Sequence, residues 1–162
     1  MTSILVQSID AKRGILKYIQ RGLCKDIYPG GVNMSKLLRS NVAKKALMKV
    51  QNVASKVRSV WDHEKTIEEQ INQIRTVLDQ ELARDEYLVI VDENGLGYIH
   101  TNRLREGSSF TDEVGLAAAK TNTGLLQIYP RDTGEILIDA SCPLLTDKNG
   151  KRFNLRMGRL VQ

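Results

Sequence analysis

The segment from residue 86 to residue 100 constrains the fold more than any other part of this chain. Five apolar or aromatic residues at 87–91 are followed by the polar stretch Asp92–Gly95 and then by a second short apolar run that ends at His100. The Asp92 carboxylate can accept a hydrogen bond from the backbone two residues further on, and Gly95 tolerates a positive φ angle. This pattern predicts a β-hairpin: a strand, a tight turn and a returning strand.

The chain after the hairpin predicts more sheet. Phe110 to Lys120 has the pattern of one or two short helices, and the segments 125–129, 135–143 and 152–160 have the composition and alternation of strands. A turn sequence at Asp147–Gly150 repeats the chemistry of the first hairpin. We therefore expect an α+β fold with a five-stranded antiparallel sheet that carries short helices on one face.

The chain before the hairpin predicts helices. Apolar residues recur at helical spacing between residues 8 and 27, and Tyr28–Gly31 ends that pattern. Residues 35–84 contain neither proline nor glycine, which favours a long helix, although the polar cluster around Asp62 predicts a kink or break. We accordingly divide the chain into an amphipathic helix and turn (1–34), a long helix (35–85) and a sheet domain (86–162).

The long helical segment carries a heptad seam, in which steps of three and four alternate. Such a seam is typical of a coiled coil, so we expect it to meet a second long helix, either from another subunit or from residues 8–27. This predicts a homodimer. The seam comprises Ala46, Val50, Val53, Val57, Val60, Ile67, Ile71, Ile74 and Leu78.

Charge is unevenly distributed along the sequence. Residues 1–60 contain 12 Lys and Arg against 2 Asp and Glu, whereas residues 61–162 contain 12 against 17, so the net charges are +10 and −5. A basic front suits nucleic acid, an anionic membrane surface or the acidic rear of another subunit. A solvated helical face is the simpler interpretation, and nucleic acid is unexpected because no aromatic residues interleave with the lysines.

Several classes of protein are disfavoured by the sequence. Cys24 and Cys142 have no CxxC spacing and lie among apolar residues, which predicts buried thiols. Apolar runs reach only about five residues, so we expect a soluble, cytoplasmic receptor, with an extracytoplasmic fragment of a membrane receptor as the alternative. Phosphate loops and hydrolase motifs are missing, and we expect no enzyme.

Alternation along the predicted strands gathers polar residues on one face. If the strands pair in the expected register, these residues line a pocket for a small polar or anionic molecule, with Arg131 and Arg156 as anion anchors. The alternative is an ordinary solvent-exposed sheet face. Asn154 shares this face, and the candidate ligand-binding residues are His100, Asn102, Arg103, Gln127, Tyr129, Arg131, Asp139, Ser141 and Arg156.

The candidate site offers one further chemistry. His63 and His100 are the only histidines, and His100 lies at a strand end beside a polar loop. No Cys–His attachment motif is present, so the only cofactor that the sequence suggests is a non-covalently bound haem with His100 as its axial ligand. A hydrogen-bonded structural histidine is the commoner role, and no cofactor is required.

Taken together, the long helix, the stretch YLVIVDENGLGYIHTNRLREG, the strand pair YPRDTGEILIDASCPL and the closing strand GKRFNLRMGRL resemble a known family. They are similar to the PAS-like single-Cache sensor domains of bacterial methyl-accepting chemotaxis receptors and related signal transducers. The resemblance covers residues 36–162. It implies a small metabolite bound between sheet and helices, dimerisation through the long helix, and output to a signalling domain beyond Gln162. The sequence departs from the family in having no transmembrane helix before the long helix.

Overall fold

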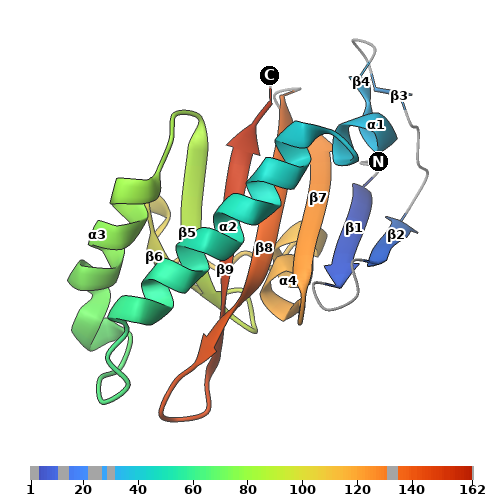
Figure 1. Cartoon of the computed structure of the whole chain (residues 1–162). Helices are drawn as coiled ribbons and strands as arrows, with labels where there is room; N and C mark the ends of the chain where they lie inside the picture. The colour runs from blue at the N-terminus through green and yellow to red at the C-terminus, as the bar shows by residue number, and fades with distance from the viewer. Residues whose placement is uncertain (1–3, 11–14, 22–26, 29–31, 131–134, 162) are drawn as a thin grey trace.

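The main sheet of the protein has seven antiparallel strands in the order β2-β1-β7-β8-β9-β5-β6. It is seen in a computed structural model that describes residues 4–10, 15–21, 27–28, 32–130 and 135–161, with side chains from residue 36 onward. Helices α2 and α3 cover one face of the sheet, and α4 lies on the opposite face (Figure 1). The helices and strands therefore form three layers, with the sheet in the middle.

The bounds of the elements follow the chain. The strands of the main sheet are β1 (Ile4–Asp10), β2 (Ile15–Arg21), β5 (Glu86–Asp92), β6 (Gly97–His100), β7 (Gly124–Pro130), β8 (Ile136–Thr146) and β9 (Arg152–Leu160). A separate pair is formed by β3 (Ile27–Tyr28) and β4 (Val32–Asn33). The helices are α1 (Met34–Leu38), α2 (Asn41–Val60), α3 (Ile71–Glu81) and α4 (Glu113–Lys120), with single 3₁₀ turns η1 (Glu68–Gln70) and η2 (Arg103–Arg105).

The predicted hairpin and the five predicted strands are confirmed. The Asp92 carboxylate accepts hydrogen bonds from the backbone nitrogens of Asn94 (2.9 Å) and Leu96 (3.1 Å), and Gly95 has a φ of 86°. The sequence predicted both the hydrogen bonding of Asp92 and the positive φ angle of Gly95. The fold is α+β: in the chain, helices α1–α3 precede the five predicted strands β5–β9, and the short helix α4 is inserted between β6 and β7.

The predicted helix at residues 8–27 is wrong. Residues 4–10 and 15–21 instead form β1 and β2, which extend the sheet beyond β7. Each segment contains two isoleucines together with a valine or a tyrosine, which favour strands, and Gly14 between them opposes a helix. An apolar pattern over only seven residues fits a strand and a helix about equally well, and pairing with β7 decided between them.

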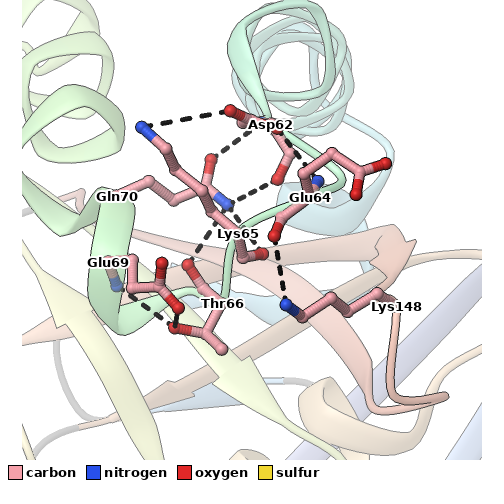
Figure 2. Close-up of polar contacts among 7 residues, drawn as sticks. All are labelled: Asp62, Glu64, Lys65, Thr66, Glu69, Gln70 and Lys148. Carbon is pink, nitrogen blue, oxygen red and sulfur yellow. Dashed lines mark hydrogen bonds and ion pairs between the residues drawn. The ribbon is translucent and has the colours of Figure 1, made fainter.

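The predicted long helix is interrupted, as expected near Asp62. Helix α2 ends at Val60, and the connector to α3 is held by Gln70 rather than by helical hydrogen bonds. The Gln70 side chain accepts from the Asp62 nitrogen (2.8 Å) and donates to the carbonyls of Asp62 (2.9 Å) and Thr66 (3.2 Å). Lys148 from the β8–β9 turn donates to the Glu64 carbonyl at 3.0 Å, as Figure 2 shows.

The prediction that the heptad seam packs against a second long helix is also wrong. All seam residues except Ile71, which is partly buried, and Val60, which is 44% exposed, are buried in one apolar core with the inner face of the sheet. The sheet residues in this core include Ile128, Ile138 and Leu155. The seam therefore packs on the sheet of its own chain, because alternate residues of the strands present an apolar face that requires a cover.

The same core contains Cys142, which is buried as predicted, and burial raises the pKa of its thiol to about 11. Cys24 lies outside the described residues. Within the described part of the chain, none of the helices is both long and apolar enough to cross a bilayer.

Candidate ligand-binding site

Strand register brings six of the nine candidate residues onto the sheet face that α4 covers. Gln127 of β7 lies opposite Asp139 of β8, and Ser141 of β8 lies opposite Arg156 of β9. Arg156 and His100 each pair with the same residue, Val89 of β5. Tyr129 follows Gln127 by two positions and so shares its face. The predicted sorting of side chains between the two faces is confirmed.

A buried ion pair lies at the centre of this face. Arg156 Nε donates to Asp139 Oδ2 at 2.6 Å, and the two side chains are 6% and 0% exposed. The Tyr87 hydroxyl donates to the same Asp139 oxygen at 3.3 Å. Burial raises the pKa of Asp139 above its ordinary value, and the charge of Arg156 opposes that rise. Burial, followed by the charge of Asp139, also raises the pKa of Tyr87, which keeps its hydroxyl protonated.

Aromatic rings surround the guanidinium group. Its carbon lies 6.0 Å from the ring centroids of Tyr87 and of Phe110, within the range of a cation–π interaction. Tyr87 also stacks on His100 with 5.3 Å between ring centroids. Gly158 makes room for this arrangement, since a Cβ atom at that position would lie 2.1 Å from the Tyr87 ring.

Two side-chain amides attach α4 to the polar face of the sheet. Gln127 Nε2 donates to the Val114 carbonyl at 3.0 Å, near the start of the helix. Asn154 Nδ2 donates to the carbonyls of Ala118 (2.9 Å) and Thr121 (3.0 Å), near its end. The amide nitrogen of Asn154 is thereby used in holding the helix, which is a structural role.

Several polar atoms of this face have no hydrogen-bond partner. The described residues contain six buried side-chain nitrogen or oxygen atoms of this kind, and four of them lie here: His100 Nε2, Gln127 Oε1, Asp139 Oδ1 and Ser141 Oγ. Leaving a buried polar group unsatisfied costs about 1–3 kcal/mol. Such a concentration in one place is typical of a site that a ligand completes rather than of a structural core.

The tautomer of His100 does not suit a haem. His100 Nδ1 accepts a hydrogen bond from the Asn102 backbone nitrogen at 2.9 Å, so in the neutral ring the proton is on Nε2. The ring is neutral because burial, followed by the charge of Arg105, lowers its pKa to about 4. Nε2 is therefore a hydrogen-bond donor, whereas an axial ligand needs a lone pair there. The described residues also contain no cluster of three or more His, Cys, Asp or Glu side chains that could hold a metal.

Two of the other three candidates do not join the cluster. Asn102 and Arg103 are exposed, and the Asn102 side chain caps the 3₁₀ turn η2 by accepting from the Leu104 nitrogen at 3.2 Å. Arg131 lies outside the described residues. Two members of the site were missed: Tyr87 could have been found from its alternation with Val89, but nothing in the sequence places Phe110 over the sheet.

The site is connected to α3 through Glu106. Its carboxylate accepts from the His100 backbone nitrogen at 3.1 Å and forms an ion pair with Arg75 of α3. Burial alone raises the pKa of Glu106, but Arg75 and the His100 N–H lower it overall, so the carboxylate is ionised. A movement of β6, which carries His100, would therefore alter the ion pair between Glu106 and Arg75.

Some of the basic side chains of α2 have ion-pair or hydrogen-bond partners within the chain. Lys49 and Lys56 of α2 form ion pairs with Glu86 and Glu81, the second at 2.6 Å. Arg58 donates to the Leu144 carbonyl at 3.1 Å. The chain itself thus supplies part of the acidic complement of the basic front, for which another subunit was one possible source, and this weakens the alternative of a nucleic-acid-binding regulator.

A hollow of about 390 Å³ lies away from the polar face, between the connector that precedes α3 and the turns of the two hairpins. Its lining includes Thr66, Glu68, Tyr98, Lys151 and Phe153. Lys151 covers the Tyr98 ring, with 4.8 Å from its nitrogen to the ring centroid. None of the predicted site residues lines this hollow.

Comparison with known proteins gives a structural similarity. Neither a family model nor a curated protein matches the sequence. Among solved structures, the crystal structure of the E. coli DcuS sensor domain is similar at 22% sequence identity and a TM-score of 0.41, over 70% of this chain and 91% of that one. The similarity concerns the backbone and says nothing about what this chain binds.

Proposed function

We propose that this chain is the sensory ligand-binding module of a bacterial signal transducer and that it binds a small metabolite with a carboxylate or another anionic group on the polar face beneath α4. The observation that carries the proposal is the group of four unpartnered buried atoms around the Arg156–Asp139 pair. A ligand with hydrogen-bonding groups would satisfy these atoms, and Arg156 would hold its negative charge.

The proposed ligand contacts are the six candidates that converge on this face. They are His100, Gln127, Tyr129, Asp139, Ser141 and Arg156, with Arg131 retained as a sequence-based anchor. We propose binding rather than catalysis, because the Ser141 hydroxyl has no base beside it and the free nitrogen of His100 already carries a proton.

The proposed signal leaves the site along β9. This strand carries Arg156 and continues to Leu160, whose backbone nitrogen bonds to the Asp85 carbonyl at 2.9 Å. A ligand that attracts Arg156 would displace β9 and with it the segment after Gln162. We propose that this segment leads to a downstream signalling domain of the chemotaxis type. A homodimer remains part of the proposal, but its contacts must lie outside the buried seam.

Thermal unfolding with a panel of small carboxylates and phosphates tests this function. We expect at least one compound to raise the Tm of the wild-type protein, because a ligand that binds only the folded state stabilises it. The matched control is the double variant Asp139→Asn/Arg156→Gln, which removes both charges and keeps polar side chains at the two positions. Absence of any response, or an equal response in the double variant, would contradict the proposal.

A further inference from the structure

We infer that the ligand of this site carries an ammonium group beside its carboxylate, as a free amino acid does. The inference rests on the proposed function and narrows the ligand class. It comes from the unpartnered atoms of the polar face, in which hydrogen-bond acceptors predominate.

The first step concerns what these atoms can do. Gln127 donates its Nε2 to the Val114 carbonyl, which leaves Oε1 as a pure acceptor. Asp139 uses Oδ2 for Arg156 and Tyr87, which leaves Oδ1 as a second acceptor. Ser141 Oγ can accept as well. A ligand that brings only carboxylate oxygens can accept from the Ser141 hydroxyl, but it leaves Gln127 Oε1 and Asp139 Oδ1 unsatisfied.

The second step concerns their placement. Gln127 and Asp139 are direct cross-strand partners, so their Cβ atoms are about 4.5–5.5 Å apart. Ser141 is two residues further along β8 on the same face, opposite Arg156. The three acceptors therefore surround one patch of the sheet next to the guanidinium group. An ammonium group has three N–H donors and a positive charge, whereas a hydroxyl has a single donor.

The third step concerns charge. Arg156 is already neutralised by Asp139, so the site as a whole has no surplus positive charge. A carboxylate that approaches Arg156 also approaches the free oxygen of Asp139, and two like charges repel. An ammonium group located between them removes this repulsion. A zwitterion of zero net charge is complementary to the buried pair.

Calorimetric titration of the whole chain with matched ligand series tests the inference. Each series keeps one carbon skeleton and changes one group: alanine, lactate, propionate and alaninamide form one, and aspartate, malate and succinate form another. We expect the amino acid of the best-binding series to bind at least tenfold more tightly than its hydroxy or unsubstituted analogue. An analogue without nitrogen that binds as tightly as the amino acid would overturn the inference.

Variants locate the preference. Ser141→Ala removes one acceptor at little risk to folding, and we expect it to weaken amino-acid binding three- to tenfold while changing the affinity for the unsubstituted acid less than twofold. Asp139→Asn is expected to abolish the preference for the ammonium group. Equal losses for both ligand types in these variants would overturn the inference and leave the proposed function intact. If no carboxylate binds the wild-type protein, the proposed function fails.

Discussion

The two faces of the central sheet are built from alternate residues of the same strands, yet they differ completely in chemistry. On the face toward α2, Ile138 and Ala140 of β8 are buried in the apolar core. On the face toward α4, Asp139 and Ser141 of the same strand are equally buried but polar. Burial alone therefore does not distinguish core from site, whereas the concentration of unpartnered buried polar atoms does.

The comparison teaches how the molecule divides its tasks. The α2 face stabilises the fold through apolar burial, with about 1.5–3 kcal/mol for each large side chain removed from water. The α4 face includes a buried ion pair and four unpartnered atoms, which are costly in the absence of a ligand. Small substitutions that leave the ion pair intact, Ile138→Val on one face and Ser141→Ala on the other, should accordingly separate stability from binding.

The largest effect is expected from Arg156→Met. The substitution leaves the Asp139 carboxylate buried without its partner, and breaking a buried pair in this way costs about 3–5 kcal/mol of the free energy of unfolding. Urea-induced unfolding measures it. The double variant Asp139→Leu/Arg156→Met should recover most of the loss. A cost below about 1 kcal/mol for the single variant would mean that the pair is solvated.

The next effect is a dependence of stability on pH that comes from His100. Its pKa is lowered from 6.5 to about 4 in the folded protein, so its contribution is fully present above pH 6.5 and is lost as the pH falls toward 4. Linkage gives a loss of about 2 kcal/mol at pH 5 and about 3 at pH 4.

Unfolding free energies of the wild-type protein and His100→Asn, measured between pH 7 and pH 5, isolate this contribution. Asparagine keeps an acceptor for the Asn102 nitrogen but does not titrate, so its profile should be flatter. Parallel profiles for the two proteins would show that His100 is not the group responsible.

A smaller effect is expected from Gly158→Ala. The new methyl group overlaps the Tyr87 ring and should cost about 1–3 kcal/mol, because it overfills a closely packed position. The displaced ring should also weaken ligand binding. Combining the change with Tyr87→Val should restore stability but not binding. If Gly158→Ala alone is neutral in both measurements, Tyr87 does not hold the guanidinium group as described.

On the apolar face, Ile138→Val should cost about 0.5–1.5 kcal/mol, since it removes one buried methylene from the core. The ligand affinity measured by calorimetry should not change. A loss of affinity that exceeds the loss of stability would mean that the two faces are not independent.

No loss of stability is expected on the polar face from Ser141→Ala. Removal of an unsatisfied hydroxyl relieves its desolvation cost, so the free energy of unfolding should equal that of the wild type or exceed it by up to about 1–3 kcal/mol. Its expected weakening of ligand binding makes it the reverse of Ile138→Val. A destabilisation above 1 kcal/mol would indicate a hydrogen bond that the hydroxyl makes within the protein.

Local chemistry explains which parts of the fold were predictable. The hairpin at Asp92–Gly95 is determined by turn residues that interact with their own backbone, and the sorting of Gln127, Asp139 and Arg156 follows from the period of two along a strand. Both features need only short stretches of sequence. They predict which residues form the central part of the site without knowledge of the register between the strands.

Long-range contacts explain the rest. The heptad seam correctly marked an apolar stripe, but a stripe does not state whether its partner is a helix or a sheet. Residues 4–10 became strand β1 because β7 offered them an edge, and residues 15–21 became β2 by pairing with β1. Phe110 reaches Arg156 from an irregular segment, where no periodicity exists to predict the direction of a side chain.

The measurement that tests the central claim most directly is hydrogen–deuterium exchange of the whole chain with and without the tightest-binding amino acid. Ligand binding beneath α4 predicts slower exchange in residues 110–120 and in β7 to β9, with little change in α2. Protection confined to the 390 Å³ hollow around Thr66, Tyr98 and Lys151 would contradict the claim that the polar face of the sheet is the ligand site.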